Sequence, residues 1–185
     1  PSLQSIDHEE KVIYLGTFSK SIAPSLRISY MVLPLHLLKK YQESCSFYST
    51  TVSKIQQEVL REFIRGGYFG RHLNKMRGIY KNKHDFLVGE LKKKNWVENI
   101  AGDNAGLHVL VQVNTTLTEE EICKKAAECG IRLMGIREHY IHTPPEGRPV
   151  LLLGYGKPDE QEIQKGLEVL ESIITGRNSN NCKKP

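Results

Sequence analysis

The chain has 185 residues, of which 39 % are hydrophobic and 25 % charged, and its formal net charge is +5. This balance is that of a folded globular protein and excludes an intrinsically disordered chain. The positive charge is modest and spread out, and its densest cluster, Lys92-Lys93-Lys94, is typical of a solvated helix end. Charge alone therefore does not indicate a nucleic-acid-binding surface.

The cysteines show neither a Cys-x-x-Cys pair nor the spacing of a zinc site; they are Cys45, Cys123, Cys129 and Cys182. We therefore expect no metal site, and we expect reduced thiols in a cytoplasmic protein. No apolar run approaches the length of a membrane span, so no membrane partner is predicted.

The first informative stretch is a short polar loop between two apolar runs, Val12 to Leu15 and Ile28 to Leu33, which predict strands. The loop carries two hydroxyls, an amine and a guanidinium, on Thr17, Ser19, Lys20 and Arg27. This set suits a phosphorylated aldehyde, because a lysine can form an imine while arginine and hydroxyls hold a phosphate. The same residue types also occur in an ordinary solvated turn.

Three helices are predicted to follow this loop, because apolar residues recur there at helical spacing. The first runs from Pro34 to Ser46, the second from the Ser/Thr-rich stretch before Lys54 to Gly66, and the third from Gly67 to about Lys94. The buried stripe of the third helix is predicted to comprise Leu73, Met76, Tyr80, Phe86, Leu87 and Leu91.

Shorter elements follow Trp96, and their order is that of a small α+β domain, a sheet with helices packed on one side. Thr118 and Asp159 are expected to cap the two helices of this part. The predicted elements are a strand over 105–113, a helix from Thr118 to about Cys129, strands over 131–134 and 150–154, and a helix over 159–176.

The string Gly16-Thr17-Phe18-Ser19-Lys20, continued by Pro24, Arg27 and an apolar strand, resembles the cofactor-lysine segment of fold-type-I pyridoxal-phosphate (PLP) enzymes. The resemblance implies that Lys20 is the Schiff-base lysine and that Arg27 and Thr17 contact the phosphate of pyridoxal 5'-phosphate, with Ser19 as a further hydroxyl. The implied fold class is α/β, the C-terminal part of a fold-type-I PLP-dependent transferase.

The string from His72 to Tyr80 resembles the interdomain helix in the aminotransferase-like domain of MocR-subfamily regulators of the GntR class. The resemblance covers about positions 11 to 176, and within the subfamily it is greatest to GabR-like regulators. The implied organisation is a large-domain remnant over 1–66, an interdomain helix over 67–94, a small domain over 95–176 and a disordered tail over 177–185.

Such regulators join a winged-helix DNA-binding domain to a PLP-binding domain that dimerises head to tail. The resemblance implies a transcriptional activator in which γ-aminobutyrate (GABA) displaces Lys20 from its internal aldimine and forms an external aldimine. Because the same residues would serve a catalytically active aminotransferase, enzymatic turnover stays an open alternative. The chain is expected to be part of a longer protein, with the DNA-binding domain and the residues that contact the cofactor ring outside it.

Two arginines compete for the carboxylate of an amino-acid effector, since a guanidinium binds a carboxylate with two parallel hydrogen bonds. Arg137 follows a predicted short strand, and Arg148 precedes the last one. Many members of the superfamily carry this arginine within the last strand, but here that strand, Val150 to Leu153, has none. This departure favours Arg137 as the effector-binding residue and an ω-amino acid as the effector. His139, Tyr140 and His142 could line the same opening.

Overall fold

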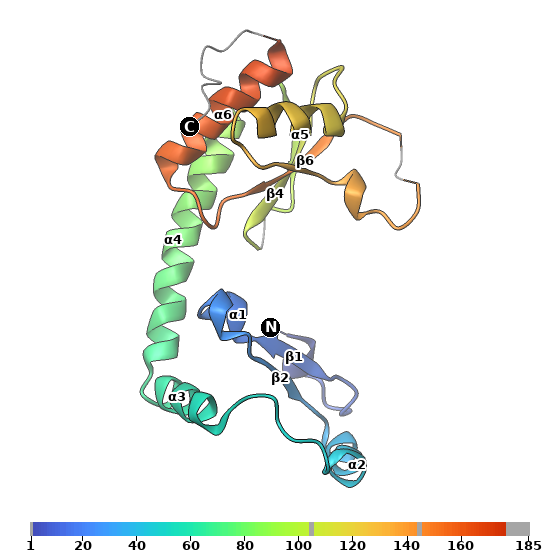
Figure 1. Ribbon diagram of the computed structural model, residues 1–185, viewed down its shortest axis with the longest axis vertical. Helices are drawn as coiled ribbons and strands as arrows, with labels where there is room; N and C mark the ends of the chain where they lie inside the picture. The colour runs from blue at the N-terminus through green and yellow to red at the C-terminus, as the bar shows by residue number, and fades with distance from the viewer. Residues whose placement is uncertain (1, 104–105, 144–145, 177–185) are drawn as a thin grey trace. The chain divides into compact units, whose positions relative to one another are not determined.

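The computed structural model describes residues 2–103, 106–143 and 146–176 (Figure 1). The chain divides into two compact units, residues 1–76 and 77–185, which we describe separately. The tail over 177–185, predicted to be disordered, lies outside the described residues. Among the described helices, none has a stretch apolar and long enough to pass through a lipid bilayer.

The first unit contains an antiparallel strand pair, β1 (Tyr14–Thr17) and β2 (Ser29–Val32), in which Tyr14 lies opposite Val32 and Thr17 opposite Ser29. The two strands lie close to the positions that the apolar runs predict. All four residues of each strand pair with the other strand. Each nevertheless keeps an outer edge that no other described strand covers.

Short helical turns and longer helices surround this pair. A 3-10 turn over Leu3–Ile6 precedes β1, and α1 (Phe18–Ser21) and a second 3-10 turn (Pro24–Leu26) connect β1 to β2. Two helices follow, α2 (Leu35–Cys45) and α3 (Lys54–Arg65). The side chain of Ser53 caps α3 by accepting a hydrogen bond from the backbone N–H of Gln56 at 3.2 Å.

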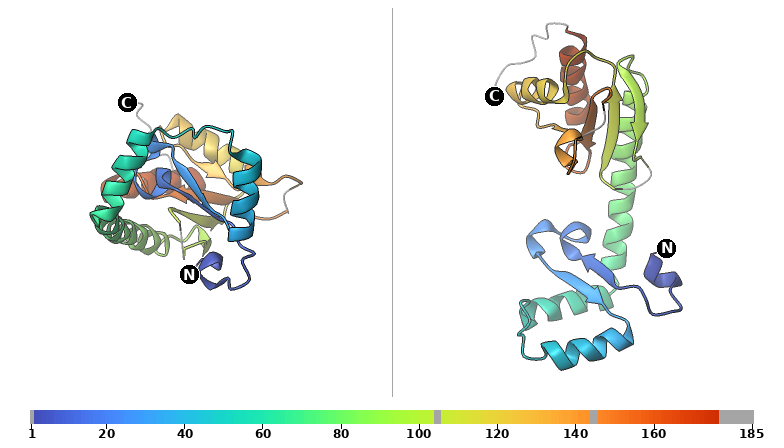
Figure 2. Two further views of the ribbon diagram at one scale, coloured as in Figure 1. Left: turned by 90° about the horizontal axis from the view of Figure 1, so that it is seen from below. Right: turned by 90° about the vertical axis from the view of Figure 1, so that its right-hand side faces the viewer.

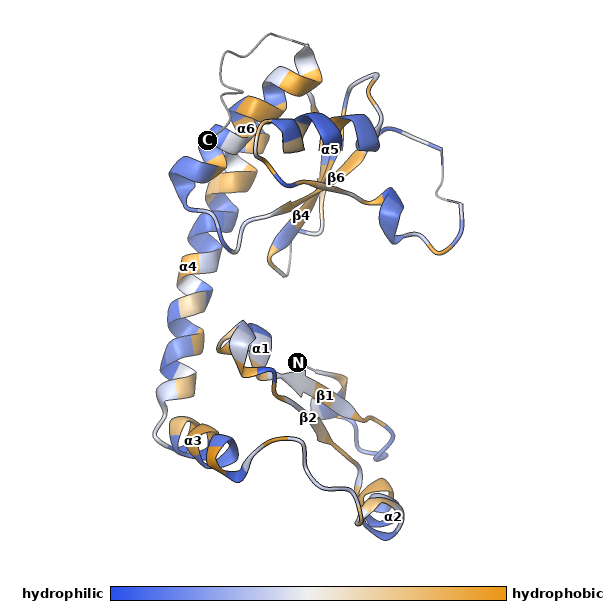
Figure 3. Ribbon diagram, in the orientation of Figure 1, coloured by the Kyte–Doolittle hydropathy of each residue, from blue (hydrophilic) through white to orange (hydrophobic). Residues whose placement is uncertain are grey.

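The first unit buries little of its apolar surface. Among its described residues, only Ile28 and Pro34 are buried. Helix α3 is amphipathic, and the apolar side chains of Ile55, Val59 and Ile64 are all exposed (Figure 3). An apolar helix face of this kind normally packs against another element, so the unit presents a surface suited to further packing.

The second unit is built on a four-stranded antiparallel sheet, with the strand order β3-β4-β6-β5. Its strands are β3 (Val97–Ala101), β4 (His108–Val113), β5 (Met134–Gly135) and β6 (Val150–Gly154). One face of the sheet is buried, through alternate residues of β4 and β6: Val109, Val111, Val113, Leu151 and Leu153. This alternation is typical of an antiparallel sheet that is covered on one side.

Helices of the second unit supply the rest of its core. Helices α5 (Glu119–Glu128) and α6 (Glu160–Thr175) lie on one side of the sheet, as predicted (Figure 2). The long helix α4 (Tyr68–Leu91) contributes Leu87, Val88 and Leu91 to the same core. Tyr80 and Phe86 of the predicted stripe pack against this core and are partly buried.

One strand was missed, one strand prediction is misplaced, and one thiol prediction is wrong. We did not predict β3, an edge strand with an irregular register between Val97 and Asn99 that weakens its alternation. The strand predicted over 131–134 is shorter and later, at β5. Cys129 is disulfide-bonded rather than reduced, and sequence spacing cannot show which cysteines approach closely enough for this bond. Cys45 and Cys123 are free thiols, as expected.

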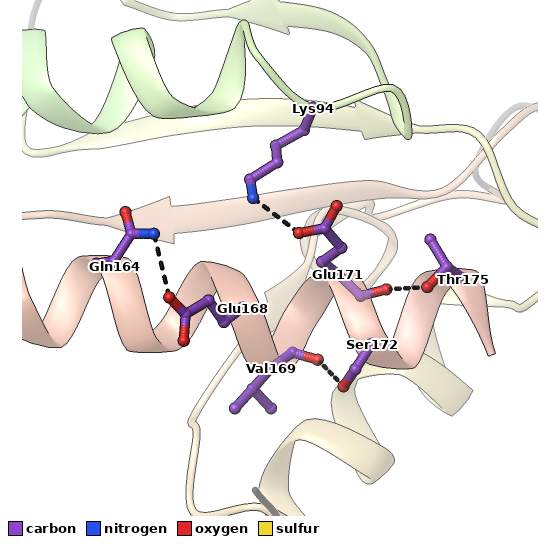
Figure 4. A network of polar contacts seen from close by, with 7 residues as sticks. All are labelled: Lys94, Gln164, Glu168, Val169, Glu171, Ser172 and Thr175. Atoms are coloured by element: carbon purple, nitrogen blue, oxygen red, sulfur yellow. Dashed lines mark hydrogen bonds and ion pairs between the residues drawn. The ribbon is translucent and has the colours of Figure 1, made fainter. Parts of the chain in front are cut away.

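An ion pair joins the turn after α4 to helix α6. Lys94 Nζ lies 2.7 Å from Glu171 Oε2, and the two side chains are 16 % and 35 % exposed (Figure 4). Figure 4 also shows the hydroxyls of Ser172 and Thr175 donating to carbonyls one turn earlier in α6. Because this ion pair is partly shielded from water, it holds the two helix ends together more strongly than a fully exposed pair would.

The helices α5 and α6 begin with the same local arrangement, a capping box. Thr118 Oγ1 accepts a hydrogen bond from the N–H of Glu121 at 3.2 Å, and Glu121 Oε2 accepts one from the N–H of Thr118 at 2.8 Å. Asp159 and Glu162 do the same at α6. These reciprocal bonds satisfy backbone donors that the first helical turn leaves free.

Replacing Thr118 by Ala removes half of the α5 capping box and is expected to lower the free energy of unfolding by about 1 kcal/mol. Urea denaturation monitored by circular dichroism measures this change. The matched control is Thr116→Ala, since Thr116 is exposed and no described hydrogen bond uses its hydroxyl. Equal destabilisation by both substitutions would contradict the assignment of the cap.

The same cap depends on pH in a defined direction. Hydrogen bonds from the backbone and the side chain of Thr118 hold the pKa of Glu121 below its usual value. The stabilisation is therefore present at neutral pH and is lost as the pH falls through the folded-state pKa of Glu121. The difference in stability between the wild type and Thr118→Ala should accordingly shrink in acid.

Candidate functional site

The loop from Phe18 to Ile28 is closed at its base by three hydrogen bonds. The backbone N–H of Phe18 donates to the carbonyl of Ile28 at 2.9 Å, and Thr17 Oγ1 donates to the same carbonyl at 3.2 Å. Thr17 Oγ1 also accepts from the N–H of Ser19 at 3.2 Å, which caps α1. Thr17 thus holds the loop together as well as presenting a hydroxyl.

Aromatic rings pack beneath this loop and explain Gly16 of the motif. Tyr30 lies opposite Gly16 in the strand pair, and a Cβ atom at Gly16 would come within 2.3 Å of the Tyr30 ring. The Tyr30 ring centroid lies 5.0 Å from that of Phe18 and 6.0 Å from that of Tyr14. A larger residue at position 16 would require this exposed ring to move from its place beside Phe18, the residue that begins α1.

The polar groups that we singled out on this loop face solvent. Lys20 is the third of the four residues of α1 and is exposed, as is Arg27, while Ser19 is half-buried. The side chains of Lys20, Ser19 and Arg27 make no hydrogen bond or ion pair with any described part of the chain. The structure therefore places all of these groups on one closed loop, with the amine and the guanidinium available to a ligand.

Arg27 has a backbone conformation that L-amino acids seldom adopt. Its φ is 51° and its ψ is 30°, in the left-handed region, directly after the turn over Pro24–Leu26. This conformation costs about 1–2 kcal/mol in a residue with a side chain. Strain of this kind concentrates at ligand-binding sites, where the geometry serves binding rather than stability.

These residues fit a phosphorylated aldehyde. Such a cofactor needs a primary amine to bond with its carbonyl carbon, and it needs cationic and hydroxyl donors for its phosphate. Lys20 offers the amine, Arg27 the cation and Ser19 a hydroxyl donor, all within residues 17–27 of one loop. The hydroxyl of Thr17 already donates to the Ile28 carbonyl, so it would have to turn away from that carbonyl to donate to a phosphate. The strained Arg27 is consistent with a guanidinium held where a phosphate would require it.

The second unit contains a cavity of about 970 Å³ beside the start of α5. Both arginines that compete for the effector carboxylate line it, together with Thr118, Cys123 and Glu138. Arg148 Nη1 is already paired with Glu98 Oε2 at 3.2 Å. The guanidinium of Arg137 forms no ion pair with the described residues. His139, Tyr140 and His142 are exposed and do not line this cavity.

One buried acid at this cavity, Glu119, was not predicted from the sequence. Glu119 is 6 % exposed, and its two carboxylate oxygens accept hydrogen bonds from the backbone N–H groups of Arg137 and Val150, each at 2.9 Å. Its position in an acidic first helical turn resembles that of a solvated residue, so the sequence held no signal for its burial. The nearby thiol of Cys123 has its pKa raised, first by burial and then by Glu138 and Glu119, and is therefore a weak nucleophile at neutral pH.

Comparison with known proteins relates the chain to two groups. The sequence profile of aminotransferase class I and II matches residues 2–164. YdeL, an uncharacterized HTH-type transcriptional regulator of Bacillus subtilis, is 39 % identical over 173 residues, which are 93 % of this chain and 37 % of YdeL. The probable rhizopine catabolism regulatory protein MocR of Rhizobium meliloti is 29 % identical over 176 residues, 94 % of this chain and 35 % of MocR.

Solved aminotransferases share the fold. The multiple substrate aminotransferase of Thermococcus profundus matches with a TM-score of 0.77 at 23 % identity, covering 92 % of this chain and 42 % of that enzyme. The aromatic aminotransferase Aro9 of C. Albicans matches with a TM-score of 0.80 at 19 % identity, covering 99 % and 43 %. The predicted fold class and the resemblance to MocR-type regulators are confirmed, and the chain spans less than half of the length of each of these relatives.

Replacing Arg27 by Gly separates stability from ligand binding. We expect the free energy of unfolding without cofactor to stay unchanged or to rise by up to about 1 kcal/mol, because the strain of the left-handed residue is relieved. We expect the affinity of the full-length protein for PLP to fall by about tenfold or more, since a charge-assisted hydrogen bond is lost. Urea denaturation and absorbance titration measure these two quantities.

The matched control is Arg27→Lys, which keeps the charge and the strained backbone but loses the planar guanidinium. Arg27→Lys should not show the gain in stability expected for Arg27→Gly. Its affinity for PLP should lie between those of the wild type and Arg27→Gly. Binding of PLP by Arg27→Gly as tightly as by the wild type would contradict a phosphate-binding role for Arg27.

Proposed function

The chain belongs to the aminotransferase class I and II family, and from this premise we propose that it is the effector-binding part of a PLP-dependent, GABA-responsive transcriptional regulator. Pyridoxal 5'-phosphate is the cofactor that family membership implies. The observation that carries the proposal is the closed loop that presents Lys20 and Arg27 with no other polar partner among the described residues. The likeness to HTH-type regulators supports regulation as the role.

When bound, the cofactor supplies an aldehyde carbon that condenses reversibly with primary amines. Lys20 provides the amine of the resting protein, in a helical turn whose start is capped by Thr17. Arg27, with the hydroxyls of Ser19 and Thr17, would hold the phosphate and so keep the aldehyde carbon beside the amine of Lys20. The fraction of Lys20 amines left unbound would then report the effector concentration.

Arg137 binds the carboxylate of the effector in this proposal. Its guanidinium lines the cavity without an ion pair among the described residues, whereas Arg148 is already paired with Glu98. Strand β6 carries only Val150, leucines and Gly154, so it offers no carboxylate-binding side chain. This absence of an arginine from β6 is the reason that we propose an effector with its amine and carboxylate at opposite ends, such as GABA.

The effector acts as a switch only if it binds one conformation more tightly than another. We propose that this difference is passed, in a cytoplasmic head-to-tail homodimer, to a winged-helix DNA-binding domain outside this chain, and that the outcome is activation of transcription. The second candidate is an aminotransferase that turns over, and the likeness of the fold to solved aminotransferases favours it. Measuring product formation separates the two.

Replacing Lys20 by Ala should abolish the visible absorbance of the protein–PLP complex and its change on adding GABA, because no other amine occupies that position on the loop. Reduction with borohydride followed by peptide mapping should label Lys20 in the wild type. The control is Lys11→Ala, which removes an exposed lysine just before β1 and should leave both signals unchanged.

The same experiment decides between the two candidates. An absorbance change with GABA and no accumulating aldehyde or keto product supports the regulator. Steady product formation makes the protein an aminotransferase. Label on a different lysine contradicts the role of Lys20 in both.

A further inference from the structure

We propose that Glu119 is a positioning residue for Arg137, because its buried carboxylate fixes the backbone from which the Arg137 side chain extends into the cavity. This inference rests on the proposed function, in which Arg137 binds the effector carboxylate. Glu119 itself contacts no effector. It acts through the hydrogen bonds that it makes to two distant backbone N–H groups.

The carboxylate of Glu119 joins three segments that are far apart in the sequence. Its Oε2 accepts from the N–H of Arg137 and its Oε1 from the N–H of Val150, both at 2.9 Å. Glu119 is the first residue of α5, Arg137 follows β5, and Val150 begins β6. A single side chain therefore sets the position of Arg137 relative to the helix and the strand that border the cavity.

The close packing of Gly135 supports this role. A Cβ atom at Gly135 would lie 2.3 Å from Glu119 Oε2 and 2.9 Å from Glu119 Cβ, which is closer than side chains approach. The φ of Gly135 is not positive, so a glycine is needed here for space rather than for backbone conformation. The next residue, Ile136, donates its N–H to the carbonyl of Val150 at 3.0 Å, which closes the same junction.

The carboxylate of Glu119 interacts with backbone N–H groups and not with the guanidinium of Arg137. Both of its carboxylate oxygens accept main-chain hydrogen bonds, and its place in the first turn of α5 adds the favourable field of a helix N-terminus. Glu119 accepts a hydrogen bond from the backbone N–H of Arg137 and not from its guanidinium. The positive charge of the guanidinium is therefore not neutralised by Glu119 and can pair with a ligand. An ion pair between the two side chains would have cancelled that charge.

The test uses the full-length protein with PLP and compares the apparent affinities for GABA and for n-butylamine, measured from the visible absorbance. Butylamine has the amine and the carbon chain of GABA but no carboxylate, so the affinity ratio isolates the contribution of the carboxylate site. Arg137→Gln should reduce this ratio by about tenfold or more, the usual effect of losing a hydrogen-bonded charge.

Glu119→Gln and Gly135→Ala should each reduce the same ratio by about threefold or more, because each displaces the Arg137 backbone without removing its guanidinium. The affinities for PLP and for butylamine should stay within about twofold of the wild type. The control Glu128→Gln changes an exposed acid at the other end of the same helix, which does not line the cavity, and should leave the ratio unchanged. If Glu119→Gln does not fold, Glu119→Asp and Gly135→Ala make the same comparison.

Amide hydrogen exchange gives an independent readout of the junction. Exchange at the N–H groups of Arg137 and Val150 should be faster in Glu119→Gln, because a neutral amide oxygen is a weaker acceptor and the amide –NH₂ cannot accept at all.

Three outcomes would contradict the positioning role of Glu119, and one of them would also contradict the proposed role of Arg137. A ratio that Arg137→Gln leaves unchanged overturns the role of Arg137 in the proposed function as well. A ratio reduced by Arg137→Gln but unchanged in both junction variants overturns the positioning role alone. Equal losses for GABA and butylamine in the junction variants show a general structural role for Glu119 and overturn the positioning role.

Discussion

The carbonyl of Ile28 is the point on which the candidate cofactor loop depends. It accepts hydrogen bonds from both the backbone N–H of Phe18 and the hydroxyl of Thr17, so it joins the end of β1 to the start of β2. Because Ile28 is buried, water competes poorly for these bonds. Everything between the two strands, including Lys20 and Arg27, is thereby confined to one short closed segment. The chemistry of the site follows from that closure.

The backbone around the cavity of the second unit is also fixed by one group that accepts two hydrogen bonds. There the acceptor is the carboxylate of Glu119 and not a backbone carbonyl. Glu119 accepts from two backbone donors and replaces the ladder bonds that the two-residue strand β5 is too short to provide. In both units, then, a side-chain oxygen fixes the backbone near one arginine, Arg27 or Arg137, whose guanidinium forms no ion pair with the described residues. Rigid backbone beneath an unpaired cation is what carboxylate or phosphate recognition requires.

The elements that were predicted correctly are those with local causes. Ser53, Thr118 and Asp159 cap helices that their own neighbours in the sequence define, and Gly176, with a φ of 68°, ends α6 as a left-handed residue. Strand β6 was predicted within its observed bounds, because its apolar run is continuous and follows a proline. The polar residues of the candidate cofactor loop were proposed from a motif that lies within a single segment, and their role stays a prediction.

What the sequence could not show arises from distant contacts. Edge strand β3 pairs through an irregular register, so its residues do not alternate as those of β4 do. Glu119 is buried only because Arg137 and Val150, 18 and 31 residues away, return to it. Nothing near Glu119 in the sequence distinguishes it from Glu120, which is exposed.

The residues that we propose for the cofactor and the effector would serve a sensor and an enzyme equally well, and the reason is physical. Both functions need Lys20 at a fixed position, and α1 is held at both ends, by Thr17 at its start and by the bond from Ser21 Oγ to the Thr17 carbonyl at 3.1 Å. Both also need a cation for the phosphate and one for the carboxylate. What would separate them is whether the freed amine of Lys20 then moves a proton from the carbon that bears the effector amine, a step that the groups binding the effector do not perform. A fold that holds an aldehyde cofactor on a lysine would thus already have the parts of a sensor, and turnover would require this additional step.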